Sequence, residues 1–124
     1  MENEKPLISI IILNYNAGDL LLNCINSVFK TKYKNYEVIL VDNISTDNSH
    51  KKCKEKFDKI QLIENLENFG YCEGNNIGIR KAKGKFIVIL NPDTIVEPNW
   101  LDEFLIGIKS GFKKIWKIKN LSLV

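Results

Sequence analysis

A wholly apolar run, Phe86–Leu90, leads directly into the polar sequence Asn-Pro-Asp-Thr at residues 91–94. A short apolar run bounded by turn residues is typical of a strand buried on both faces, as in a parallel sheet. The strand should end before Pro92, because proline has no N–H to donate to a neighbouring strand. Asp93 then lies just beyond the carboxyl end of a buried strand, where open α/β sheets bind ligands. Asn, Pro and Asp are also ordinary turn formers, so a simple turn is the alternative.

Three further apolar runs precede this one, and helical patterns separate them. We expect strands at Leu7–Leu13, Tyr36–Val41, Ile60–Glu64 and Phe86–Leu90. We expect helices from Leu20 to an end near Lys30 to Lys34, from about Asn48 to Phe57, from about Asn75 to Ala82 and from Pro98 to Ile108, with a long polar loop over Asn65–Gly74. Strands that alternate with helices predict an α/β fold, a Rossmann-like parallel sheet with flanking helices and right-handed crossovers.

The charge of the chain argues against a nucleic-acid-binding protein. The net charge is +3, but five of the 18 basic residues lie within residues 109–124, which contain no acid. The preceding 108 residues therefore hold 13 basic and 15 acidic side chains. A nearly neutral body lacks the basic surface that binds a phosphate backbone. With 124 residues and 44% hydrophobic side chains, the chain is expected to form one domain with a real core.

The remaining composition indicates an intracellular protein. Neither the N-terminus nor any apolar run resembles a signal peptide or approaches the ~20 apolar residues of a membrane span. Cys24, Cys53 and Cys72 are too widely spaced for a zinc site or a disulfide framework, which favours a reducing cytoplasm. His50 is the only histidine, and we expect it to be a solvated residue on a charged helix.

Polar residues follow every predicted strand. They are Asn14-Tyr15-Asn16, Asp42-Asn43, the Asn65–Gly74 loop and Asn91-Pro92-Asp93. Because the carboxyl ends of parallel strands share one edge of the sheet, these residues should gather there and form a ligand site. Four independent polar turns are the alternative.

The loop after the first strand limits which ligand this edge can bind. It contains only one glycine, Gly18, whereas dinucleotide and Walker loops need several so that the backbone can approach phosphate. A phosphate would instead be neutralised by a metal ion on Asp93. Tyr15 offers a face on which a base can stack, and Asp42 can accept from a base N–H or a ribose hydroxyl. Together they predict a nucleoside-diphosphate site.

Four stretches, at residues 9–16, 41–49, 68–78 and 90–94, carry a family resemblance. Over about residues 6–108 the chain resembles the N-terminal half of family 2 inverting glycosyltransferases, which have the GT-A fold. The Asn-Pro-Asp-Thr sequence is most similar to the rhamnosyltransferase-type branch. The resemblance implies a UDP-, dTDP- or GDP-linked sugar donor, an Mg²⁺ or Mn²⁺ ion, and transfer with inversion to a hydroxyl of a saccharide or lipid-linked saccharide.

The resemblance also implies roles for individual residues. Asp93 matches the last acid of the family's Asp-x-Asp motif and would bind the metal, while Asn91 stands where the first acid often is. The implied donor-binding set is Asn14, Tyr15, Asn16, Asp42, Asn68, Gly70, Asn91 and Asp93. The general base of the family lies downstream, in an acceptor-binding half. No residue of this chain matches it, so none is assigned.

The resemblance stops at about residue 110, which we take as the end of a donor-binding half domain, residues 1–110. Residues 111–124 form a basic and apolar tail. We expect the tail to reflect a truncation; a contact between copies of the chain, or a peripheral contact with the inner face of the membrane, is the alternative. Truncation should expose an apolar edge or face and favour a homo-oligomer. A non-catalytic nucleotide-binding or self-associating module is the alternative function.

Overall fold

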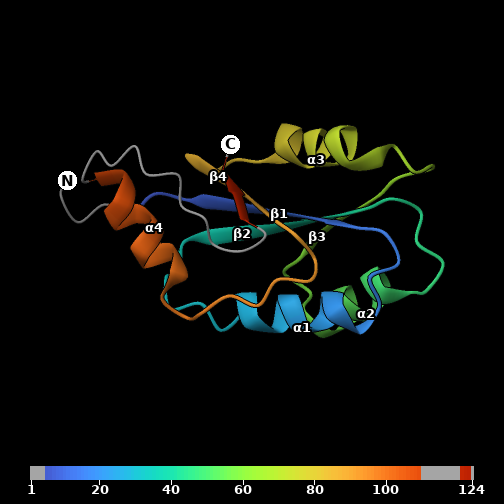
Figure 1. Ribbon diagram of the computed structural model, residues 1–124, viewed down its shortest axis with the longest axis horizontal. Helices are drawn as coiled ribbons and strands as arrows, with labels where there is room; N and C mark the ends of the chain where they lie inside the picture. The colour runs from blue at the N-terminus through green and yellow to red at the C-terminus, as the bar shows by residue number, and fades with distance from the viewer. Residues whose placement is uncertain (1–4, 110–120, 124) are drawn as a thin grey trace.

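The computed structural model describes residues 5–109 and 121–123. Figure 1 shows a sheet with helices on both faces. The strands are β1 (Ile8–Asn14), β2 (Tyr36–Asp42), β3 (Gln61–Glu64), β4 (Phe86–Leu90) and β5 (Leu121–Leu123). The helices are α1 (Asp19–Val28), α2 (Ser49–Lys56), α3 (Gly70–Lys81) and α4 (Trp100–Lys109).

The order of the strands across the sheet is β3-β2-β1-β4-β5. The chain therefore adds β2 and β3 on one side of β1 and β4 on its other side. The first four strands are parallel, as the sequence predicts, with β1 paired to β2 on one side and to β4 on the other. Helices α1 and α2 lie on one face of the sheet and α3 on the opposite face (Figure 1). The carboxyl ends of β1 and β4 therefore flank a topological switch point, where open α/β sheets bind their ligands.

The end of the tail adds a fifth strand that the sequence analysis did not predict. Strand β5 is antiparallel to β4, with Leu121 opposite Leu90 and Leu123 opposite Val88. The outer edge of β4 is therefore paired within the chain over Val88–Leu90, where an exposed edge was expected. The rest of the predicted tail, residues 111–120 and 124, lies outside the described residues.

Alternation of side chains along the strands divides the core between the two faces. On β1, Ile8, Ile10 and Ile12 face the layer that contains α1, α2 and α4, whereas Ile11 faces α3. On β2, Leu40 and Val41 divide in the same way. This two-residue period is the geometry of an extended strand, and it decides which strand-end side chains reach which face.

Helix α3 begins at Gly70, five residues earlier than predicted. The prediction placed the start too late because the glycines in this stretch obscure the helical pattern. Glycine inside a helix is unfavourable by roughly 1 kcal/mol relative to alanine, so this stretch reads as a loop. The packing explains the glycines. A Cβ atom at Gly78 would lie 2.6 Å from Ile11 Cγ2, and one at Gly74 would lie 2.7 Å from Leu13 Cδ1. The missing side chains let α3 lie directly against β1 and β2.

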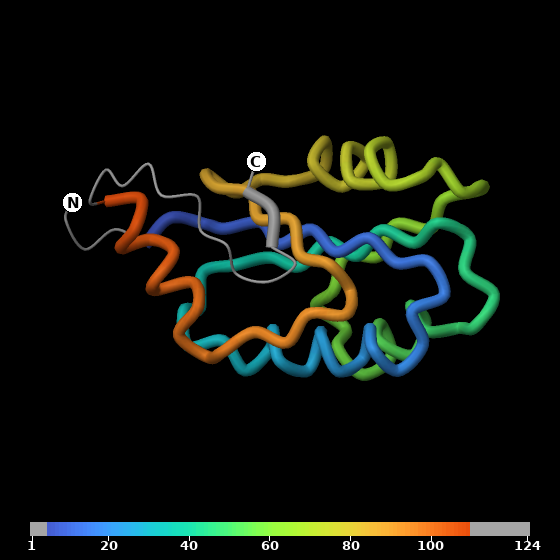
Figure 2. The backbone as a smooth tube through the Cα atoms, viewed as in Figure 1, coloured from blue at the N-terminus to red at the C-terminus, as the bar shows by residue number. Residues whose placement is uncertain are grey.

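The segment between β4 and α4 runs close to α1 (Figure 2). Two hydrogen bonds connect this part of the chain to α1 and the residues that follow it. Ser27 Oγ accepts a hydrogen bond from Val96 N at 3.1 Å, and Trp100 Nε1 donates to Thr31 Oγ1 at 2.9 Å. Helix α4 begins at Trp100, so Pro98 precedes the helix and is not its first residue. In the described ranges, no helix is both long and apolar enough to cross a membrane.

Candidate functional site

A pocket of about 550 Å³ lies at the carboxyl ends of β1 and β4, beside the start of α3. Its volume is within the range of small-molecule sites. Its walls combine aromatic, apolar and amide side chains with one carboxylate. The lining residues are Leu13, Tyr15, Asn43, Asn68, Gly70, Tyr71, Asn75, Leu90, Asn91, Pro92 and Asp93.

Five of the eight predicted donor-binding residues line this pocket: Tyr15, Asn68, Gly70, Asn91 and Asp93. Tyr15 is 55% exposed and lies on the pocket wall, where a ligand can contact it. These residues are up to 78 positions apart in the sequence, between Tyr15 and Asp93, and the parallel topology brings them together as expected.

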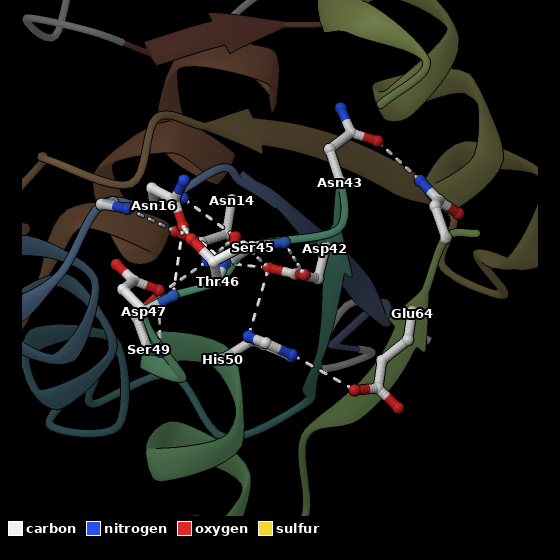
Figure 3. Close-up of polar contacts among 12 residues, drawn as sticks. Asn14, Asn16, Asp42, Asn43, Ser45, Thr46, Asp47, Ser49, His50 and Glu64 are labelled. Atoms are coloured by element: carbon white, nitrogen blue, oxygen red, sulfur yellow. Dashed lines mark hydrogen bonds and ion pairs between the residues drawn. The ribbon is translucent and has the colours of Figure 1, made fainter. Parts of the chain in front are cut away.

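Asn14 and Asp42 do not line the pocket. Both are buried, and they belong to the polar network that Figure 3 shows. Asn14 Nδ2 lies 2.9 Å from both Asp42 Oδ1 and Ser49 Oγ. Asp42 Oδ2 accepts from Ser45 N at 2.8 Å. Their polar atoms are engaged within the protein, and they support the loops that carry the pocket residues.

Asn16 joins the β1–α1 loop to the β2–α2 loop (Figure 3). Its Oδ1 accepts from Thr46 N at 2.7 Å, and its backbone N donates to Ser45 Oγ at 2.9 Å. Its φ of 50° lies in the left-handed region, which asparagine tolerates better than most residues. Asn14 and Asn16 therefore hold Tyr15 from both sides, and neither is part of the pocket wall.

The neighbouring Asp47 strengthens the same loop junction. Burial alone would raise the pKa of this carboxyl, but hydrogen bonds from the side chain and backbone of Ser49 and from Gly18 N hold the pKa below its usual value. Gly18 N lies 2.9 Å from Asp47 Oδ2, and Gly18 has a φ of 60°. The carboxylate thus accepts donors from both loops.

His50 is buried, and the expectation that it is solvated was wrong. It is 4% exposed, with Nδ1 3.4 Å from Asp42 Oδ1 and Nε2 3.2 Å from Glu64 Oε1 (Figure 3). The lysines of α2 obscure the short buried face that Ser49, His50 and Cys53 form. His50 connects the carboxyl ends of β2 and β3.

Asn43 and Tyr71 lie in the polar stretches that were expected to gather at this edge, but no donor contact was predicted for either of them or for Asn75, and all three line the pocket. Strand alternation explains why Asn43, and not Asp42, reaches the pocket. Asp42 shares the face of Leu40, toward α2, whereas Asn43 follows Val41 on the α3 face. Asn43 Nδ2 also donates to Gly70 O at 3.1 Å, which fixes the start of α3. The alternation of side chains along each strand could therefore have predicted which strand-end residues face the pocket.

The pocket fits a metal ion that binds together with a phosphorylated ligand. Asp93 supplies an exposed carboxylate and Asn91 an amide oxygen on the same wall. In the part of the chain that the structure describes, no three or more His, Cys, Asp or Glu side chains cluster into a metal cage. Mg²⁺ is commonly bound by one or two carboxylates, with substrate phosphates and waters completing its shell. Asp93 matches that arrangement.

The three cysteines are unpaired and differ in their surroundings. Burial raises the pKa of the Cys24 thiol to about 12 and that of Cys53 to about 11. Both thiols are therefore poor nucleophiles at neutral pH. Cys72 is exposed and follows the pocket residue Tyr71 on α3.

Comparison with known proteins identifies sequence relatives. The model of the family "Glycosyl transferase family 2" matches residues 9–113. Glycosyltransferase GlyG of Streptococcus pneumoniae serotype 4 is 35% identical over 101 residues, which are 79% of this chain and 34% of the relative. The Escherichia coli protein WfgD, a UDP-Glc:alpha-D-GlcNAc-diphosphoundecaprenol beta-1,3-glucosyltransferase, is 36% identical over 100 residues, 80% of this chain and 40% of the relative. The chain spans about a third of the length of several such relatives.

Solved structures share the fold. A mannosyltransferase, PcManGT of Pyrobaculum calidifontis in complex with GDP-Man and Mn²⁺, superposes with a TM-score of 0.73 at 24% identity, over 80% of this chain and 31% of that one. S. aureus TarS 1–349 in complex with UDP-GlcNAc gives a TM-score of 0.76 at 22% identity, over 83% and 31% of the two chains.

Proposed function

Because this chain belongs to glycosyl transferase family 2 and has the GT-A fold, we propose that its pocket binds a nucleotide-diphosphate sugar. Residues 1–110 would form the donor-binding half of an enzyme that transfers the sugar to an acceptor hydroxyl. The observation that supports this most is the pocket itself, which combines an open tyrosine ring with an exposed carboxylate at the switch point of the sheet.

The proposed roles follow from the position of each residue. The ring of Tyr15 stacks on the nucleobase, since aromatic side chains prefer offset-stacked arrangements with other rings. Asn68 and Gly70 line the donor from the α3 side of the pocket, and Asn91 contacts the donor from the β4 side. Asp93 holds Mg²⁺ or Mn²⁺, which when bound would offset the charge of the departing diphosphate.

The printed names of similar proteins support the class of ligand. PcManGT was solved with GDP-Man and Mn²⁺, and TarS 1–349 with UDP-GlcNAc. WfgD is named for a UDP-Glc donor and a diphosphoundecaprenol-linked acceptor. We extend these to a UDP-, dTDP- or GDP-linked sugar and a saccharide or lipid-linked saccharide acceptor for this chain.

The proposed reaction is a single displacement with inversion. The acceptor hydroxyl attacks the anomeric carbon, its proton passes to a carboxylate base, and the bond to the diphosphate breaks. We assign no residue of this chain as the base. Asp102 and Glu103 lie in the first turn of α4, where acids are stabilised by the helix dipole.

The proposal is tested by thermal stabilisation with UDP, dTDP and GDP, each with and without Mn²⁺. A nucleotide at ~100 times its Kd should stabilise the chain by roughly 2.7 kcal/mol. We expect Mn²⁺-dependent stabilisation in the wild type, its loss in Asp93→Asn, and its retention in Asp58→Asn, which removes an exposed acid remote from the pocket wall.

A second assay, which measures sugar transfer, distinguishes a donor-binding half from a chain that is active alone. Nucleotide binding without transfer supports a donor half that needs an acceptor half, and transfer supports a minimal transferase that assembles its base through a dimer. Failure of all three nucleotides to stabilise the wild type contradicts the proposed function and favours a non-catalytic interaction module.

A further inference from the structure

The side chain of Cys24 contacts the turn that carries Asp93, the proposed metal ligand. Cys24 lies on α1 and is fully buried, and its Sγ is 3.7 Å from Asn91 O. The same thiol accepts a hydrogen bond from the backbone of Thr94. Because a thiol is both a weak donor and a weak acceptor, it can make the two contacts together. Cys24 therefore holds the main chain on both sides of Asp93.

The Cys24 thiol keeps its proton at neutral pH, so it retains both roles. Burial raises the pKa of Cys24 to about 12, and the hydrogen bond from Thr94 lowers this pKa only in part. The nearby charge of Asp93 is among the causes that raise the pKa, which places the carboxylate close to the sulfur. The S–H can thus donate to Asn91 O while the sulfur accepts from the Thr94 backbone.

The contact of Cys24 belongs to a row of contacts along the α1 side of the molecule. Further along the segment between β4 and α4, Val96 N donates to Ser27 Oγ at 3.1 Å. Ser27 is three positions from Cys24, so the two side chains lie on one face of α1. Helix α1 therefore serves as a support for this segment, and Cys24 is the residue at which the support reaches the turn.

Contacts within the turn are not enough to place Asp93. The turn is closed by a hydrogen bond from Thr94 N to Asn91 O at 3.1 Å, but β4 ends at Leu90, so sheet pairing does not extend to these residues. A metal ligand must be held to within roughly 0.5 Å of its productive position. Groups that orient metal ligands typically change metal affinity by about 10–100-fold when they are removed.

We propose that Cys24 is a positioning residue for the metal site: its thiol fixes the turn that carries Asp93, and so sets how strongly a divalent metal ion binds together with the nucleotide. The inference rests on the proposed function of the same pocket. Cys24 is fully buried and is not one of the residues that line the pocket, so it acts through the turn. Its loss should change the metal dependence of nucleotide binding and leave the metal-free affinity unchanged.

The test measures the Kd of UDP by titration calorimetry, once with saturating Mn²⁺ and once with EDTA. The ratio of the Kd in EDTA to the Kd in Mn²⁺ gives the contribution of the metal ion. On the wild type we expect a ratio well above one, which Asp93→Asn abolishes. If dTDP or GDP stabilises the wild type more than UDP does, that nucleotide replaces UDP.

Three variants test the thiol. Cys24→Val keeps a similar volume but cannot form hydrogen bonds, and we expect its ratio to be about tenfold lower, with an unchanged Kd in EDTA. Cys24→Ser keeps a donor and an acceptor, so its ratio should be closer to that of the wild type. Cys53→Val makes the same change at a fully buried thiol of α2, and should keep the wild-type ratio.

A circular dichroism melt of each variant confirms folding before titration, and Cys24→Ala replaces Cys24→Val if the valine variant does not fold. A lower melting temperature with an unchanged ratio would mean that Cys24 has only a structural role, and would overturn the inference. An equal fall of the ratio in Cys53→Val would also overturn it.

The wild type alone distinguishes the failure of this inference from that of the proposed function. Nucleotide binding that Mn²⁺ does not strengthen overturns the inference and leaves the nucleotide site in place. Absence of binding by UDP, dTDP and GDP overturns the proposed function together with the inference.

Discussion

Single residues at the strand ends divide into a buried set that supports the site and a pocket set that lines it. Asn14 is the most connected member of the buried set. Its amide nitrogen approaches Asp42, Ser45 and Ser49, and its Oδ1 accepts from Ala17 N at 3.3 Å. One amide thus holds a buried carboxylate and the loop that carries Tyr15.

Replacement of Asn14 should therefore destabilise the whole chain. Asn14→Ala leaves Asp42 buried without one of its donors, and hydrogen bonds to charged groups are worth about 1.5–3 kcal/mol. We expect a loss of about 2–3 kcal/mol in urea unfolding. The matched change Asn23→Ala, at an exposed position of α1, should stay within about 0.5 kcal/mol of the wild type. Equal stability of the two variants would contradict the supporting role of Asn14.

Some of the site residues could be predicted from the sequence and others could not. Tyr15 and Asp93 could be predicted because each lies within three residues of the end of an apolar run, and a parallel sheet brings such positions to one edge. Asp42 was predicted to contact the donor, but a shift of one residue along a strand reverses the face, and Asn43 is the residue that reaches the pocket. The burial of His50 depends on Asp42 and Glu64, which only the folded chain brings to it.

Among the elements, β1 to β4 were predictable to within one residue at each end, because apolar runs are local signals. Helix α3 was not, because its first turns are polar and contain glycine. The reason for those glycines lies in the contact with β1, which is distant in the sequence. The helix that carries Gly70, Tyr71 and Asn75 into the site is thus specified by packing more than by helix propensity.

Gly78→Ala tests whether close packing of α3 matters more than helix propensity. Alanine should gain about 1 kcal/mol as a helix former. Its Cβ would lie 2.6 Å from Ile11 Cγ2 and 3.0 Å from Val41 Cγ2, and overpacking typically costs about 1–3 kcal/mol. We expect a net loss of stability of about 1 kcal/mol and weaker nucleotide binding, because α3 must move outward.

The control is Asn76→Ala, at an exposed position of the same helix, which gains propensity without a clash. Chemical unfolding of both variants and one UDP titration of each provide the comparison. If Gly78→Ala proves as stable as Asn76→Ala and binds UDP equally well, close packing of α3 is not what the glycine provides.

Polar side-chain contacts connect the strands at both ends of the sheet. At the end opposite the pocket, Glu37 accepts from Lys83 N at 2.7 Å, Ser9 Oγ at 2.5 Å and Gln61 Nε2 at 2.8 Å. Burial alone would raise the pKa of Glu37, but these hydrogen bonds and the nearby Lys83 charge lower the pKa below its usual value. Glu37 thereby joins β1, β2, β3 and the approach to β4.

A carboxyl whose folded pKa is lowered stabilises the fold above its unfolded pKa, and this stabilisation is lost as the pH falls through the folded pKa. For Glu37 this stabilisation should be lost below about pH 4.5, which is the ordinary pKa of a glutamate side chain. We expect Glu37→Gln to be less stable than the wild type at pH 7, and the difference to narrow in acid. Glu55→Gln, an exposed change on α2, should show no such trend. Urea unfolding from pH 7 to pH 3 measures both, and a difference that grows in acid would contradict the role of Glu37.

The uneven burial of the three cysteines has a practical consequence for optical spectroscopy. Cys24 and Cys53 are enclosed, while Cys72 faces solvent one residue beyond Tyr71. A maleimide dye added to the folded wild-type chain should therefore attach at a single position at the rim of the pocket. The natural sequence already contains a fluorescence sensor site, from which ligand titrations can be followed by emission without engineering a thiol.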